Sequence, residues 1–262
     1  MAAKVICFAN NKGGSGKSTT CSNVGYGLTL LGKKVLMIDG DMQCNLSLAF
    51  FSEDQVLEFA KGEKNLYRCL LDQKSVKNSI CHTAFENLDL VPSSSLMSGI
   101  EFDLFTKWQR ELILKNCLEE VRESGEYDYI LLDAPPTLGC LVMNLLVASD
   151  SLIIPVEASP WGLFGLANMF DFLKSVQRIA PSLSLMGIAV TKVDTRKNYF
   201  RQTMEYLNSQ DEVHVFKNYI RTDSMVEWSQ DSSMPVIAYK RSSRSAQEYM
   251  ELTKEVDQLG SR

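Results

Sequence analysis

The sequence has no long hydrophobic run, no internal repeat and no low-complexity tract. No uninterrupted apolar stretch approaches the roughly 18 residues that a membrane-spanning helix needs, which argues against a membrane-spanning protein. The start, "MAAKVICFAN", is too short and too polar for a secretory signal, so we expect a cytoplasmic protein. Because no linker interrupts the chain, residues 1–262 are expected to form a single domain.

Paired cysteines and an excess of positive charge are also missing. The seven cysteines include no C-x-x-C pair, which argues against a disulfide framework and a zinc site, so most are expected to be buried. The net charge of -5 gives the whole protein no bulk attraction for nucleic acid. Residues 192–244 differ, since they hold nine Lys and Arg against seven Asp and Glu, and a modest basic surface is expected there.

Short aliphatic runs alternate with longer helical stretches along most of the chain. The expected strands are "KVICFA", "KVLMID", "LDLVP", "YILLD", "SLIIPV" and "LMGIAVT". Helices are expected to begin near Lys17, Trp108, Thr137, Gly162, Tyr199 and Ser243, the last one reaching Leu259. The stretch from residue 52 to residue 79 has no clear assignment. This alternation predicts an α/β fold with one doubly wound, mostly parallel sheet and helices on both faces.

The segment "NNKGGSGKST" lies between the first expected strand and the first expected helix. It departs from the phosphate-loop pattern G-x-x-x-x-G-K-[ST], because Asn11 stands at the position of the first glycine. Gly13, Gly14 and Gly16 let the backbone turn tightly around Ser15, so that successive N–H groups face an anion. The segment therefore predicts a nucleotide site rather than a glycine turn with incidental lysines.

The residues after this turn have the chemistry that a bound nucleotide requires. Lys17 is expected to reach the β- and γ-phosphates, Ser18 to coordinate Mg²⁺ and Thr19 to contact the α-phosphate. "KGGSGKST" resembles the deviant Walker A motif, K-G-G-x-G-K-[ST]-T, of the ParA/MinD ATPase superfamily. The resemblance implies ATP and Mg²⁺ as cofactors and a P-loop NTPase fold.

The additional lysine of that motif maps onto Lys12. The resemblance implies that Lys12 crosses a dimer interface to the nucleotide of the partner, where it acts as an arginine finger does. Two nucleotide sites would then be completed only in a sandwich homodimer with ATP between the subunits. The residues alone leave open that Lys12 is an exposed lysine without such a role.

Two acidic segments follow the second and fourth expected strands. "VLMIDGDMQCNLS" resembles the family pattern D-x-D-P-Q-x-N, which implies that Asp41 orients the attacking water and that Asp39 supports Mg²⁺. Met42 replaces the family proline, so this turn is expected to be less rigid. The alternative to these roles of Asp39 and Asp41 is a solvated aspartate pair that caps a helix. "YDYILLDAPPTLG" ends in the Walker B pattern, which places Asp133 near Mg²⁺, and matches the D-x-P-P switch segment.

Contacts to the base and to DNA are expected from the last third of the chain. Thr191 stands where GTPases have the asparagine that reads guanine, so ATP is favoured, with base contacts from Ile220 and Arg221. The closing segment resembles ParA/Soj partition ATPases, which bind DNA without sequence preference. The matching basic positions are Arg196, Arg221, Lys240, Arg241 and Arg244. A solvated charged face is the alternative.

Two related functions fit the same motifs less well. MinD-type proteins end in a basic amphipathic helix, whereas "SAQEYMELTKEVDQLGSR" is mostly acidic, so membrane binding is disfavoured and Tyr249, Leu252 and Val256 are expected to face the core. Nitrogenase-type electron carriers need two thiolates per subunit, and Cys140 has no second cysteine in "LVPSSSLMSG". We therefore interpret the chain as a nucleoid-associated ParA-type ATPase that works with a ParB-type partner.

Overall fold

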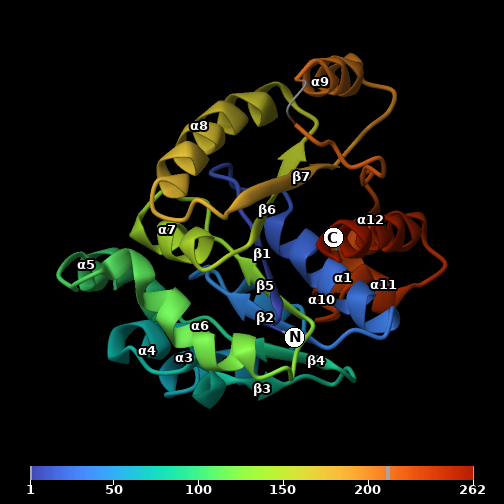
Figure 1. The fold of residues 1–262 in the computed structure, drawn as a ribbon. Helices are drawn as coiled ribbons and strands as arrows, with labels where there is room; N and C mark the ends of the chain where they lie inside the picture. Colours follow the sequence, from blue (N-terminus) through green and yellow to red (C-terminus); the bar gives the residue numbers. More distant parts are fainter. Residues whose placement is uncertain (1, 211–212, 262) are drawn as a thin grey trace.

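The computed structural model describes residues 2–210 and 213–261, except for the side chains of residues 160, 161 and 164. Within this part of the chain, a central sheet has the strand order β3-β4-β2-β5-β1-β6-β7 (Figure 1). The strands are β1 (Lys4–Phe8), β2 (Val35–Asp39), β3 (Cys81–His82), β4 (Leu88–Val91), β5 (Tyr129–Asp133), β6 (Ser151–Glu157) and β7 (Ser184–Thr191). All neighbours pair in parallel except β3, which pairs antiparallel with β4 at one edge. The predicted α/β fold is confirmed.

Helices cover both faces of this sheet (Figure 1). The α-helices are α1 (Lys17–Leu30), α2 (Asn45–Leu48), α3 (Glu53–Lys61), α4 (Leu66–Asp72), α5 (Ile100–Phe105), α6 (Ile113–Glu123), α7 (Cys140–Val147), α8 (Pro160–Gln177), α9 (Asn198–Asn208), α10 (Ser224–Asp231), α11 (Val236–Tyr239) and α12 (Arg244–Gly260). Short 3₁₀ turns are η1 (Val76–Ser79), η2 (Ser95–Gly99) and η3 (Arg110–Leu112). None of the helices in the described ranges combines the length and apolar composition that crossing a bilayer requires.

The strands are hydrophobic on both sides because both sides are covered. Every residue of β2 and of β5 is buried. Successive side chains point to opposite faces, so Val5 and Cys7 of β1 join the core beneath α4 to α8. Ile6 and Phe8 join the second core, which α1 and α12 cover. Two cores therefore hold the sheet in place from either side.

Helix α12 packs as the sequence predicts. Tyr249, Leu252 and Val256 are all buried in the second core. The helix approaches α1 closely at Gly27, where an added Cβ would lie 2.5 Å from the Thr253 hydroxyl oxygen. The absence of a side chain at Gly27 thus permits the contact between the first and last helices.

Two helix starts differ from the sequence prediction. The helix expected near Trp108 begins instead at Ile113, because Gln109 has a positive φ of 50° that interrupts a helix, and Trp108 lies exposed. The helix expected near Thr137 begins at Cys140, after the stiff Pro135–Pro136 pair. The unassigned stretch from residue 52 forms α3, α4 and η1, with a capping box between Ser52 and Gln55.

Candidate nucleotide-binding site

The predicted nucleotide motifs meet at the carboxyl ends of neighbouring strands. Asp133, the last residue of β5, pairs in register with Phe8 of β1 on one side and with Asp39 of β2 on the other. The glycine-rich loop leaves β1 at this edge and enters α1. Ligands of open parallel sheets bind at this edge, where the strand order reverses.

The loop has the backbone conformation that its glycines permit. Gly14 and Gly16 have φ values of 74° and 85°, in the left-handed region that favours glycine. Gly16 forms the N-cap of α1 without any side-chain cap, so the first N–H groups of the helix remain available to an anion. The Thr191 hydroxyl donates to the Ser15 carbonyl at 2.8 Å, which fixes the loop against the end of β7. Thr191 therefore supports the loop instead of facing a base.

Lys17 lies buried at the base of the site. Its Nζ donates to the Lys12 carbonyl at 3.3 Å. Burial lowers the pKa of Lys17, and the carboxylates of Asp133 and Asp41 oppose this shift. A largely desolvated ammonium next to free helix N–H groups attracts phosphate strongly, because little water screens it.

Asp133 is a buried carboxylate that has the Ser18 hydroxyl and the Lys17 ammonium nearby but no hydrogen bond of normal geometry. Both of its carboxylate oxygens are buried without a hydrogen-bond partner in the part of the chain that the structure describes. Burial, followed by the neighbouring Asp39, raises the pKa of Asp133 well above its usual range, and the Ser18 hydroxyl acts in the opposite direction. Such a carboxylate is costly to bury unless a cation neutralises it.

The donor set around Asp133 fits Mg²⁺. Magnesium prefers hard oxygen ligands, keeps several waters and takes only one or two ligands from the protein where phosphates supply the others. Ser18 and Asp133 are suitable oxygen donors of this kind. The described residues contain no group of three or more His, Cys, Asp and Glu side chains that could hold a metal ion.

The two predicted loop aspartates have different surroundings. Asp39 is buried, and its Oδ2 accepts from the Ser47 backbone N–H at 2.8 Å and from the Ser47 hydroxyl at 2.6 Å. Its Oδ1 accepts from the Asp41 N–H at 3.1 Å, yet burial outweighs these bonds and raises the pKa of Asp39 to about 6. Asp41 instead lines the cleft described below, and its Oδ1 accepts from the Gln43 N–H at 3.0 Å. Asp39 thus holds the loop that presents Asp41.

A cleft of about 720 Å³ extends from the glycine-rich loop to α10. Its end at the glycine-rich loop, where phosphate binding is predicted, contains Gly13, Gly14, Gly16, Lys17, Ser18 and Thr19, and its other walls include Asp41, Pro136, Ile220, Arg221, Val226, Met234 and Pro235. The Gln230 side chain donates to the Thr19 hydroxyl at 3.0 Å across this cleft. The volume and the mixed lining suit a nucleotide. Sequence patterns did not indicate Gln230, Val226 or Met234, because these residues belong to no motif.

Lys12 points away from this cleft. Its Nζ contacts Glu157 Oε2 at 2.7 Å and the Ser159 hydroxyl at 2.9 Å, at the end of β6. The Lys12 side chain remains 24% exposed, whereas Lys17 is almost fully buried. The two lysines of the loop therefore have different surroundings, and the Lys12 side chain forms no hydrogen bond with a described residue of the glycine-rich loop.

Known proteins share both the sequence and the architecture described so far. Residues 3–185 match the family described as AAA domain. Over 97% of its length the chain is 36% identical to the sporulation initiation inhibitor protein Soj of Bacillus subtilis, 98% of which is covered. Over the same share it is 32% identical to the chromosome-partitioning ATPase Soj of Treponema pallidum, 96% of which is covered. The chain belongs to the ParA/Soj family of partition ATPases.

One solved structure that resembles this ParA/Soj-family protein contains bound ligands. The cobyrinic acid a,c-diamide synthase of Mycobacterium smegmatis, with bound ADP and magnesium, has a TM-score of 0.81 and 26% identity. The match covers 96% of this chain and 93% of that one. A structural neighbour with this fold therefore binds nucleotide and magnesium. The family relationship supports ATPase activity in general.

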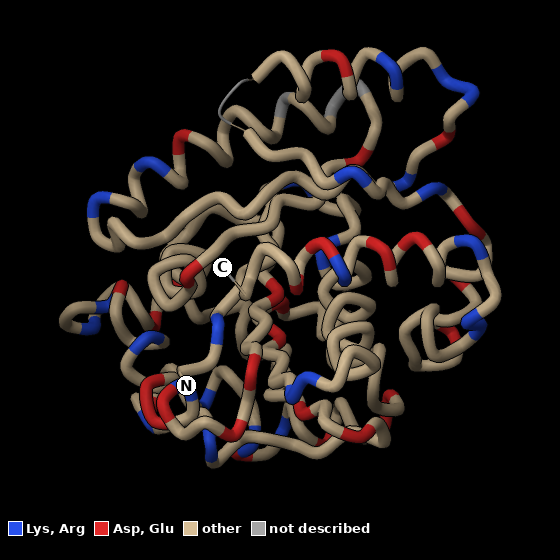
Figure 2. Tube along the Cα trace, turned by 45° about the vertical axis from the view of Figure 1, so that its right-hand side comes forward, with Lys and Arg blue, Asp and Glu red and all other residues tan. Residues whose placement is uncertain are grey.

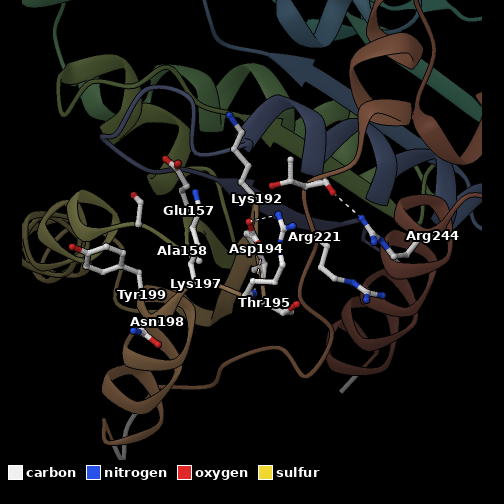
Figure 3. A pocket seen from close by; sticks show the side chains of 14 residues that line it. Glu157, Ala158, Lys192, Asp194, Thr195, Lys197, Asn198, Tyr199, Arg221 and Arg244 are labelled. Atoms are coloured by element: carbon white, nitrogen blue, oxygen red, sulfur yellow. Dashed lines mark hydrogen bonds and ion pairs between the residues drawn. The ribbon is translucent and has the colours of Figure 1, made fainter.

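The ParA/Soj-family protein carries basic and acidic residues interspersed over its whole trace (Figure 2). Three of the five predicted DNA-binding residues, Arg196, Arg221 and Arg244, line a second hollow of about 890 Å³ together with Lys192 and Lys197 (Figure 3). This basic hollow adjoins the nucleotide cleft. The two share Lys192, Arg221 and Thr222.

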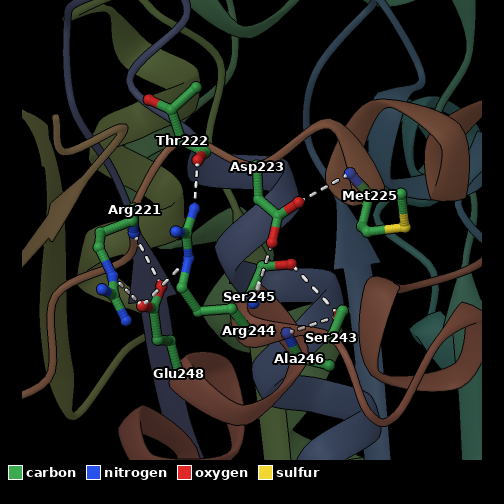
Figure 4. Close-up of polar contacts among 9 residues, drawn as sticks. All are labelled: Arg221, Thr222, Asp223, Met225, Ser243, Arg244, Ser245, Ala246 and Glu248. Atoms are coloured by element: carbon green, nitrogen blue, oxygen red, sulfur yellow. Dashed lines mark hydrogen bonds and ion pairs between the residues drawn. The ribbon is translucent and has the colours of Figure 1, made fainter.

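Part of the charge in the basic hollow is already paired. Arg221 contacts Glu248 through its guanidinium and its backbone N–H, the latter at 2.8 Å, and Arg244 donates to the Thr222 carbonyl at 2.7 Å (Figure 4). Arg196 forms two bonds of 2.9 Å with Asp194.

The other two predicted DNA-binding residues differ from these arginines. Lys240 and Arg241 lie exposed between α11 and α12, outside the basic hollow, and no ion pair joins either to another described residue. The ParA/Soj-family protein thus has two kinds of basic position: arginines whose guanidinium groups contact acids or carbonyls, and surface cations that form no ion pair with a described residue.

Proposed function

We propose that the protein is a Mg²⁺-dependent ATPase that dimerises on ATP and binds double-stranded DNA without sequence preference in the dimeric state. A ParB-type partner would stimulate hydrolysis and so release the dimer from DNA. The observation that supports the proposal best is the buried Asp133 carboxylate, which accepts no hydrogen bond from a described residue and lies near Lys17, a residue that lines a nucleotide-sized cleft.

The proposed chemistry needs little covalent work from the protein. Phosphoryl transfer to water depends on positioning and on neutralising charge, so the loop N–H groups and Lys17 would bind the β- and γ-phosphates. Magnesium, held by Ser18 and through water by Asp133, would supply further positive charge. Asp41 would orient the attacking water from the wall of the cleft.

Dimerisation would bring a second cation to each site. The Lys12 side chain lies beside Glu157 and Ser159 in the single protomer, so it must leave this ion pair to reach a phosphate of the partner. The triphosphate would compete with Glu157 for the lysine because it carries more negative charge. Each protomer would then complete the site of the other.

DNA binding would follow from dimerisation. Arg196, Arg221 and Arg244 around the basic hollow, and Lys240 and Arg241 beside it, would contact phosphates of the duplex without reading bases. One protomer offers few free cations, and a dimer doubles them, which raises the effective affinity. A nucleoid-associated location in the cytoplasm would result.

Co-sedimentation with DNA and with anionic liposomes, run in parallel, tests the proposal. With a slowly hydrolysed ATP analogue and Mg²⁺, we expect retention on duplex DNA and none on liposomes; without nucleotide, neither should retain the protein. Lys17→Ala is the matched control and should remain unbound under every condition. Retention on liposomes alone would replace this proposal with a MinD-like function.

A further inference from the structure

The segment that follows Asp133 is fixed at both ends. At its start, the Ala134 N–H donates to the Phe8 carbonyl at 3.0 Å, and the Asp133 carbonyl accepts from the Gly40 N–H at 2.9 Å. At its far end the segment enters α7 at Cys140. Between these points, Pro136 lines the nucleotide cleft, so the course of the segment shapes the site.

Glu101 of α5 holds the far end. Its Oε2 accepts from the Cys140 N–H at 2.7 Å and its Oε1 from the Leu141 N–H at 3.2 Å. Helix α7 has no N-cap side chain of its own, so this carboxylate satisfies two of its otherwise open N–H groups. A negative charge is also favourable at a helix N-terminus. Helices α5 and α7 lie side by side (Figure 1).

Gly139 makes room for this contact. A Cβ added to Gly139 would lie 2.2 Å from Glu101 Oε1, closer than any side chain can approach. Gly139 has a negative φ of -108°, so its backbone alone would accept another residue. The space for the Glu101 carboxylate therefore explains this glycine.

We infer that Glu101 is a positioning residue for ATP hydrolysis. It anchors the start of α7 and thereby keeps Pro136 and the rest of the Asp133 segment in place around the nucleotide. Glu101 lines neither the cleft nor the basic hollow, so it acts through this segment and not on the substrate. The inference rests on the proposed ATP site at Lys17 and Asp133.

Steady-state phosphate release measures the effect. Glu101→Ala should lower kcat at saturating MgATP about fivefold to tenfold, while KM, the Kd for a fluorescent ATP analogue and Tm change little. The kcat of Glu101→Gln should lie between those of the wild type and Glu101→Ala, because the single carbonyl oxygen of glutamine keeps one of the two hydrogen bonds. Asp103→Ala is the matched control: Asp103 lies on the same helix but accepts from the Tyr67 hydroxyl, and kcat should be unchanged.

Gly139→Ala provides an independent test through the same contact. In the wild-type background it should lower kcat as Glu101→Ala does, because the new methyl group displaces the carboxylate. In the Glu101→Ala background it should have no further effect, since the clash is gone. If Glu101→Ala folds poorly, Gly139→Ala in the wild-type background still reports the effect of losing the contact on kcat.

Two results would overturn the inference. One is wild-type kcat in Glu101→Ala, and the other is a full additional decrease in kcat on adding Gly139→Ala to it. Lys17→Ala distinguishes an error in the proposed ATP site from an error in the role of Glu101. If Lys17→Ala hydrolyses ATP as the wild type does, the proposed ATP site itself is wrong; if it is inactive while Glu101→Ala is fully active, only the role of Glu101 is wrong.

Discussion

Single residues of the glycine-rich loop have separate tasks that follow from their surroundings. Lys17 is buried at the phosphate end of the cleft, whereas the Lys12 ammonium lies 2.7 Å from Glu157 at the rim. Identical side chains within one loop therefore differ in hydration and in charge partners. Their substitutions should separate nucleotide binding from dimer formation.

We expect Lys17→Ala to abolish ATP binding and Lys12→Ala to leave it close to wild type. The first substitution removes the buried cation at the phosphates, whereas the second removes a side chain that contacts Glu157 and Ser159. Lys12→Ala should nevertheless remain monomeric with MgATP. Titration with a fluorescent ATP analogue and light scattering provide the measurements. An ATP-dependent dimer of Lys12→Ala would contradict the cross-subunit role.

A second residue-scale prediction concerns Asp41. Asp41→Ala should still dimerise with ATP, because the phosphates and Mg²⁺ have other partners, but its turnover should fall by about 100-fold or more, as for removal of a catalytic base. Phosphate release and light scattering on the same samples measure both properties. A variant that stays monomeric with ATP would show that Asp41 acts in assembly rather than in hydrolysis.

Among the secondary-structure elements, the strands with continuous apolar runs were predictable, whereas the shortest elements were not. In the part of the chain that the structure describes, every strand except β3 follows from a continuous hydrophobic segment, since a covered parallel strand needs apolar side chains on both faces. Strand β3 comprises only Cys81 and His82, which is too short for any pattern. Helices α2 and α11 have four residues each and depend on tertiary packing, which the sequence does not display.

The contact between α1 and α12 supports a prediction about an element pair. Gly27→Ala should lower the free energy of unfolding by about 1 to 3 kcal/mol, as for other overpacked contacts, because the new Cβ would meet the Thr253 side chain. Thermal unfolding measures the effect as a lower Tm. In a Thr253→Ala background the same substitution should cost less; an equal cost there would mean that the strain arises elsewhere.

At the scale of the whole molecule, the sequence motifs predict which residues lie together at the candidate site, but they do not predict the contacts that hold these residues in place. The loop residues from Gly13 to Thr19 except the buried Ser15, together with Asp41 and Ile220, line one cleft, as their motifs suggested. The hydrogen bond from Gln230 to Thr19 spans 211 positions of the sequence, and the ion pair between Glu157 and Lys12 spans 145 positions. Neither separation belongs to a known motif. Such contacts arise only when the sheet brings distant loops together.

The distribution of charge leads to a prediction about DNA retention. The double variant Lys240→Glu, Arg241→Glu should weaken ATP-dependent retention on duplex DNA. The slope of log K against log salt concentration should become less steep by about 0.9 for each phosphate that the variant no longer neutralises. These two side chains are exposed and form no ion pair with a described residue, whereas a change at Arg221 would also remove a guanidinium that is paired with Glu248. Sedimentation over a range of salt concentrations gives the slope.

A charge-matched control accompanies that experiment. Lys61→Glu with Lys115→Glu makes the same change in net charge at exposed positions on α3 and α6, away from α11 and α12 (Figure 1). Retention by this control should match the wild type. Equal weakening of both double variants would mean that overall charge, rather than this surface, governs the affinity.

The bond between the Thr191 hydroxyl and the Ser15 carbonyl has a consequence for synthesis on the ribosome. It joins residues 176 positions apart, so the loop emerges long before the strand that braces it. A nascent chain that ends before β7 carries every glycine of the loop, yet its turn lacks this brace. Competence to hold a triphosphate should therefore arise late in translation, and an unfinished chain should not capture ATP while still attached to the ribosome.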